Sequence, residues 1–172
     1  EVFDEVYIPI PAGSYERGST TSSSTSPVKT IDIGDMFVNR TEVTVWQYKE
    51  CVDAGECPTP TTGIYCNWGV PDREWHPINC ITLAEAVNYA DWKDRQDPVL
   101  HIRLPSEAEW EYIAKSLGQD QPYPWGFDVP TCDFAQFREV FYGCGLKTTS
   151  PVCRTSTTLT PRQAILPNGD TT

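Results

Sequence analysis

The sequence predicts a loop-rich domain in which about three helices and several short strands are separated by irregular segments. Three capping-box patterns begin helical stretches, and short β-branched runs near the N-terminus are interrupted by Pro and Gly. About fifty residues after Gly118 show almost no periodicity. With 172 residues the chain is long enough to bury a core without metal or disulfides.

The strand patterns lie in the first forty residues. Residues 6–15 mix β-branched and aromatic side chains with prolines, which predicts an edge strand that ends in a Gly turn. In residues 28–38 apolar and polar side chains alternate, which predicts one or two short strands, broken at Gly34-Asp35. Between them, residues 19–27 are expected to form a Ser/Thr-rich surface loop, which we interpret as a flexible connector; O-glycosylation and specific binding are the alternatives.

Three helices are expected after Thr44, Thr82 and Ser106, because each of these hydroxyl residues precedes a Glu or Gln by three positions. The predicted helices cover residues 45–54, 83–95 and 107–117. Apolar spacing gives each one an expected buried stripe. The stripes are Val45, Tyr48, Cys51 and Val52 in the first helix, Leu83, Ala86, Val87 and Ala90 in the second, and Trp110, Ile113, Ala114 and Leu117 in the third.

Charge restricts the classes of partner. The chain has 24 acidic and 13 basic side chains, a formal charge of −11, so nucleic acid and anionic membranes would repel it. No run approaches the ~18 consecutive apolar residues of a membrane span. We therefore expect a protein partner, a second chain or self-assembly.

Seven cysteines without a C-x-x-C pair, beside only two histidines, are typical of disulfides in an oxidising compartment. We expect a secreted protein, extracellular or periplasmic, whose signal peptide is absent from the sequence. Four cysteines frame the loop after the first helix and allow three connectivities. We favour nested bridges, each worth about 2–4 kcal/mol through loop restraint. These bridges are Cys51–Cys80 and Cys57–Cys66.

The remaining cysteines lie in the irregular part of the chain. Cys132 and Cys144 are expected to close a second loop, which leaves Cys153 as a free thiol or bonded outside this chain. A zinc site is the alternative for the first loop, although the tight C-x₂₋₄-C spacing of structural zinc sites is missing. Its ligands would be Cys57, Cys66, His76 and Cys80.

Five segments then carry a resemblance to a known family. They are IPAGSY at 10–15, RTEVT at 40–44, RLPSEAEWEY at 103–112, YPWG at 123–126 and SPV at 150–152. Their order and spacing resemble the formylglycine-generating enzyme, or sulfatase-modifying factor, family over about residues 6–152. The resemblance implies an irregular α+β fold similar to a C-type lectin, which we expect to be incomplete in this chain.

The same resemblance implies that the family's oxidase activity depends on residues further along. Enzymes of the family carry a later GNVWEW-like segment and a cysteine pair that binds copper, and neither is matched here. No catalytic or cofactor-binding residue is therefore carried over. Copper is expected only if a catalytic C-terminal half exists, and most of the family's calcium ligands also belong to that half.

Two functions follow as hypotheses. The first is a secreted, non-catalytic module with a binding or extracellular assembly role. The alternative is the N-terminal part of a formylglycine-generating oxidase, which converts a sulfatase cysteine to formylglycine with copper and oxygen.

Smaller features offer other sites. Glu107 and Glu111 share a helix face and resemble an acid–base pair, but acidic residues in a first helical turn are usually structural. Asp32 and Asp35 are candidate calcium ligands, although carboxylates around a Gly usually mark a turn. Asn39 begins an N-glycosylation sequon.

Overall fold

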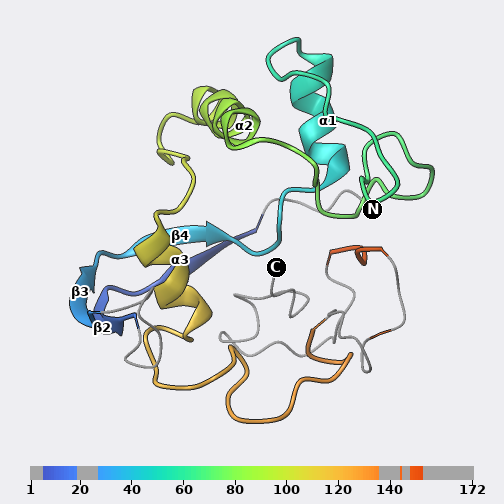
Figure 1. The fold of residues 1–172 in the computed structure, drawn as a ribbon. Helices are drawn as coiled ribbons and strands as arrows, with labels where there is room; N and C mark the ends of the chain where they lie inside the picture. The colour runs from blue at the N-terminus through green and yellow to red at the C-terminus, as the bar shows by residue number, and fades with distance from the viewer. Residues whose placement is uncertain (1–5, 19–26, 136–143, 145–147, 153–172) are drawn as a thin grey trace. The chain divides into compact units, whose positions relative to one another are not determined.

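The computed structural model describes residues 6–18, 27–135, 144 and 148–152 (Figure 1). The chain divides into two compact units, which are described separately below. Among the described residues, the first unit contains 6–18, 27–41 and 105–135, and the second contains 42–104, 144 and 148–152. Residues 19–26 of the Ser/Thr-rich loop expected over 19–27, and Cys153, lie outside the described part.

Two antiparallel strand pairs build the first unit. Strand β1 (Tyr7–Ile10) pairs with β4 (Met36–Asn39), and β2 (Gly13–Arg17) pairs with β3 (Lys29–Ile33). The break expected at Gly34-Asp35 is confirmed. The single strand expected over 6–15 is wrong, because Pro11 and Ala12 lie outside both ladders and the chain changes partner there.

Helix α3 (Glu107–Ala114) packs against β2 and β3 (Figure 1). Its Tyr112 and Ile113 join Ile10, Tyr15 and Ile33 in one buried cluster. Two tyrosine hydroxyls tie the helix to the strands: that of Tyr15 donates to the carbonyl of Ala108 at 2.9 Å, and that of Tyr112 to the carbonyl of Pro11 at 3.2 Å.

The buried stripe expected for this helix is wrong in part. Ile113 is buried as expected, but Trp110 is 53% exposed and Tyr112 takes the central position. A tyrosine hydroxyl here reaches a backbone acceptor, so the large ring is buried without an unpaired polar atom. The helix also ends earlier than residue 117, because Ser116 and Leu117 have left-handed φ values of 49° and 66°.

Glu111 connects α3 to the end of β2. Its carboxylate accepts from the backbone N–H of Gly18 at 3.1 Å and pairs with Lys115 at 2.9 Å. Burial alone would raise the pKa of Glu111, but the hydrogen bonds from Lys115 and Gly18 and the nearby charge of Arg17 lower it. Glu107 pairs with Arg17 at 2.7 Å. Both carboxylates are thus engaged in ion pairs.

Helices α1 (Val45–Asp53) and α2 (Leu83–Gln96) belong to the second unit. All three predicted capping boxes are present, with side chain and backbone bonded reciprocally at Thr44, Thr82 and Ser106. In α1 the expected residues Val45, Tyr48 and Cys51 are buried.

The buried stripe expected for α2 is wrong except at Ala90. The helix instead buries Tyr89 and Trp92, whose rings pack with Tyr48 of α1, and it leaves Leu83 75% exposed. The Tyr89 ring stacks on Tyr48 at 5.6 Å between centroids and lies 5.7 Å from Trp92. Two aromatic rings bury more area than the Leu and Val of the predicted stripe, which decides the face.

In the part of the chain that the structure describes, no helix is long and apolar enough to cross a membrane.

Gly118 tests how tightly the chain packs against Tyr15 and Tyr112 after α3, and Gly55 is the matched control. Both have φ +76°, but a Cβ at Gly118 would overlap Tyr15 and meet Tyr112 at 3.2 Å, whereas one at Gly55 meets nothing within 4 Å. We expect Gly55→Ala to cost about 1 kcal/mol of unfolding free energy, from the left-handed φ alone. Gly118→Ala should cost a further ~1–3 kcal/mol through overpacking. Urea unfolding measures both, and equal losses would contradict this packing.

Candidate functional site

Two disulfides fix the segment between α1 and α2. Cys51 bonds to Cys57 with a Cα–Cα distance of 5.2 Å, and Cys66 bonds to Cys80 at 5.6 Å. The nested pairing expected from the sequence is therefore wrong. Helix α1 ends at Asp53, and the chain turns back so that the N–H of Cys57 bonds the carbonyl of Cys51 at 3.2 Å. This turn brings the nearer cysteine into bonding range.

The disulfides also exclude the zinc alternative, since the proposed thiolate ligands Cys57, Cys66 and Cys80 are all oxidised. Cys132 and Cys144 are each disulfide-bonded as well. Over residues 6–18, 27–135, 144 and 148–152, no group of three or more His, Cys, Asp or Glu side chains could hold a metal ion. Asp32 and Asp35 are exposed, and Asn39 is the last residue of β4.

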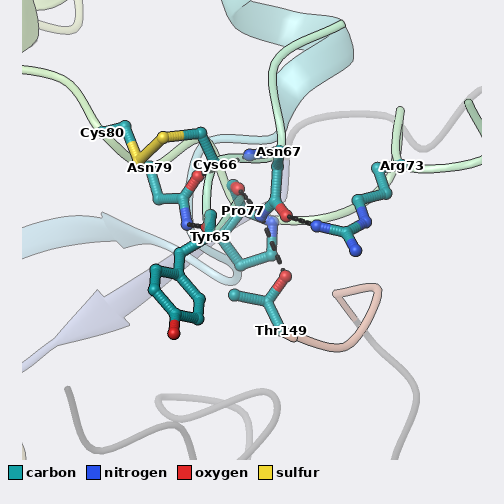
Figure 2. Close-up of a disulfide and its surroundings, with 8 residues drawn as sticks. All are labelled: Tyr65, Cys66, Asn67, Arg73, Pro77, Asn79, Cys80 and Thr149. Atoms are coloured by element: carbon teal, nitrogen blue, oxygen red, sulfur yellow. Dashed lines mark hydrogen bonds between the residues drawn. A yellow bond between two sulfur atoms is a disulfide. The ribbon is translucent and has the colours of Figure 1, made fainter. Parts of the chain in front are cut away.

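Asn67 is the centre of the hydrogen-bond network beside the second disulfide (Figure 2). Its side chain is completely buried, which for an amide requires that its polar atoms be paired. The amide Nδ2 donates to the carbonyl of Pro77 at 2.8 Å and to Oγ1 of Thr149 at 2.9 Å. Its Oδ1 accepts from Arg73 at 2.9 Å, and its backbone N–H donates to Oδ1 of Asn79 at 2.8 Å.

The network extends to a segment distant in sequence. Thr149 Oγ1 also lies 2.7 Å from Nδ1 of His76, a residue only 9% exposed. Three residues later, the N–H of Val152 donates to the carbonyl of Trp75 at 2.9 Å. Residues 149–152 are thus docked on residues 67–76 by three hydrogen bonds.

The loop segment around His76 is attached to the start of α1. The carbonyl of His76 accepts from the N–H of Val45 at 2.9 Å, and the N–H of Ile78 donates to the carbonyl of Val43 at 2.8 Å. The Trp46 ring stacks on the Trp75 ring with 5.7 Å between centroids. The loop after α1 is therefore irregular in shape but held at several points along its length.

One turn of this loop presents apolar side chains to solvent. The N–H of Cys66 donates to the carbonyl of Gly63 at 3.0 Å, and Asn79 Nδ2 donates to the carbonyl of Tyr65 at 2.8 Å. Ile64 is 86% exposed and Tyr65 is 64% exposed. Figure 2 shows the Tyr65 ring pointing away from the disulfide and the asparagines. A fixed backbone thus carries two exposed large side chains.

Reasoning from the sequence missed Asn67 and Thr149. An asparagine is usually exposed, and only its position between Cys66 and Trp68 hinted at burial. Thr149 directly precedes the SPV segment. Its partners, His76 and Asn67, lie 73 and 82 residues earlier in the chain, and no local sequence pattern could indicate them.

Removing the Asn67 side chain tests the network. We expect Asn67→Ala to lower the free energy of unfolding by about 2–4 kcal/mol, because the buried Pro77 carbonyl loses its donor. Asn67→Asp should be no milder, since an oxygen would then face that carbonyl. Urea unfolding measures the loss. The exposed Asn88 of α2 is the control, with Asn88→Ala expected within about 0.5 kcal/mol of wild type. An equally mild Asn67→Ala would contradict the role of the network.

Comparison with known proteins places this geometry in context. The family model of the sulfatase-modifying factor enzyme 1-like domain matches residues 4–155. The formylglycine-generating enzyme of Mycobacterium tuberculosis is 28% identical in an alignment 169 positions long, which covers 69% of this chain and 54% of that enzyme. The enzyme of Bos taurus is 31% identical in an alignment 104 positions long, which covers 54% of this chain and 25% of that enzyme.

Solved structures agree on the fold. PvdO from Pseudomonas aeruginosa superposes with a TM-score of 0.71 at 22% identity, covering 87% of this chain and 62% of PvdO. CarF superposes with a TM-score of 0.59 at 17% identity, covering 90% of this chain and 74% of CarF. The loop-rich α+β fold predicted from the sequence is confirmed by these neighbours.

The chain spans about half the length of the Mycobacterium tuberculosis enzyme. Its disulfides fit a location outside the reducing cytosol. With a family model that covers residues 4–155, the chain belongs to the sulfatase-modifying factor, or formylglycine-generating enzyme, family.

Proposed function

We propose that this chain is a secreted module of the family that serves a binding or structural assembly role, and that its described residues take no part in catalysis. The observation that carries the proposal is the turn at residues 63–66, where two large apolar side chains are exposed on a fixed backbone.

Rigidity makes this turn suited to binding. The Cys66–Cys80 disulfide, the Gly63–Cys66 hydrogen bond and the Asn79–Tyr65 bond already restrict the backbone. Binding through such a turn loses little further conformational entropy, so more of the contact energy appears as affinity. Tyr is also among the residues that most often dominate protein interfaces.

Exposed apolar side chains and net charge indicate the kind of partner. Ile64 and Tyr65 are both exposed on this turn, which fits a protein with an apolar pocket, either another chain or a second copy of this one. The formal charge of −11 favours a partner whose pocket is surrounded by basic side chains, since complementary charge accelerates encounter.

The cysteines support a non-catalytic role for these residues. When bound, copper would supply oxygen-dependent oxidation chemistry in the family's enzymes, and it requires free thiolates. All six cysteines that the structure describes are in disulfides, so they do not fit such a site. Calcium stays an expectation for parts of the family domain beyond these residues.

Photo-crosslinking tests the binding turn. A benzophenone-bearing residue replaces Ile64, and the exposed Thr59 of the same loop is the control position. With the secreted fraction of the source cells, we expect one defined protein adduct from position 64 and none from 59. Tyr65→Ala should reduce its yield about tenfold or more, as loss of an interface anchor does. The purified chain alone reveals self-assembly. Equal adducts from both positions, or none at all, would refute the proposal.

The alternative function rests on the names of the relatives, which are formylglycine-generating enzymes. Under it, the chain is the N-terminal part of an oxidase that converts a sulfatase cysteine to formylglycine. The purified chain, incubated with copper and a CxPxR peptide, is expected to leave the peptide mass unchanged. Appearance of the aldehyde product would overturn the non-catalytic proposal.

A further inference from the structure

We propose that the Cys66–Cys80 disulfide is a redox-sensitive clasp that determines whether residues 149–152 stay docked on the Asn67–His76 segment. The proposal does not depend on what Tyr65 contacts.

The clasp joins the two asparagines that build the network. Asn67 directly follows Cys66 and Asn79 directly precedes Cys80, and the N–H of Asn67 donates to Oδ1 of Asn79 at 2.8 Å. Figure 2 shows the disulfide and this pair side by side. The covalent bond therefore fixes the relative position of the two loop segments, at Cys66-Asn67 and Asn79-Cys80, on which the buried amide depends.

The docking of residues 149–152 depends in turn on the side-chain amide of Asn67. Thr149 Oγ1 is bonded by Asn67 Nδ2 and lies beside His76 Nδ1, and the Val152 N–H bonds the Trp75 carbonyl. If the two loop segments separate, the Asn67 side chain loses its buried position and becomes hydrated. Its bond to Thr149 then has no advantage over a bond to water.

The two described disulfides of this loop differ in accessibility. Cys80 is exposed, whereas Cys51 is completely buried and Cys57 is 7% exposed within the Tyr48 cluster. Cys80 also has a left-handed φ of 60°, a strained conformation for a side chain with a Cβ. Reduction would allow this residue to relax, and exposed or strained disulfides are the more easily reduced ones.

The reaction balances with a dithiol reductant. A thiolate of the reductant attacks the sulfur of Cys80, because Cys80 is an exposed residue, whereas Cys66 is only 7% exposed and a Cβ at Gly63 would lie 3.3 Å from its Sγ. The S–S bond breaks and Cys66 leaves as a thiolate, which takes up a proton. The second thiol of the reductant then displaces Cys80, so two electrons and two protons reach the protein and the reductant becomes a disulfide.

Hydrogen exchange at the Val152 amide tests the clasp. The chain is titrated with dithiothreitol, and the free thiols are alkylated and located by mass spectrometry. We expect Cys66 and Cys80 to be alkylated before Cys51 and Cys57. Exchange at Val152 should then accelerate at least about tenfold, while the Tyr48 amide inside α1 stays slow.

Paired variants identify the responsible bond. Cys66→Ala with Cys80→Ala should show fast Val152 exchange without any reductant, which excludes reduction elsewhere as the cause. Cys51→Ala with Cys57→Ala should keep slow exchange until dithiothreitol is added. The proposal is overturned if Val152 exchange is unchanged in the first pair. It is equally overturned if Tyr48 accelerates in parallel, because that would mean general unfolding.

Discussion

The second unit depends on one buried amide. Asn67 is completely enclosed, and its four hydrogen bonds reach the Pro77 carbonyl, Thr149, Arg73 and Asn79. A buried amide without partners would cost several kcal/mol, so burial is tolerated only when every bond is made. The loop after α1, the segment at 74–78 and residues 149–152 are all held in place through hydrogen bonds to Asn67.

Covalent bonds take the place of regular structure around that amide. Between α1 and α2 the described backbone has no helix or strand ladder, and two disulfides and side-chain hydrogen bonds hold it. The same bonds explain why apolar residues can be exposed there. The Asn79 hydrogen bond and the Cys66 disulfide hold the backbone of the turn, so the turn does not depend on burial of Ile64 and Tyr65 for its conformation. Binding and redox sensitivity would therefore share one loop.

Local signals were the ones that sequence reasoning used well. The capping boxes at Thr44, Thr82 and Ser106 were predicted and are present, because each depends on residues three positions apart. Pairing and burial were predicted less well. The nested disulfide pairing was wrong because the turn after Asp53 brings Cys57 to Cys51. The buried stripe that began at Leu83 was wrong because α2 packs Tyr89 against the Tyr48 ring.

The sequence by itself determined the helix starts, the break between β3 and β4, the loop-rich class and the family. Each of these is encoded in short patterns whose physical cause acts within a few residues. Only the tertiary structure decided which cysteines pair, which helix faces are buried, and that Asn67 meets Thr149, 82 residues away. Such contacts are set by packing and by the need to pair buried polar atoms, and neither leaves a local pattern in the chain.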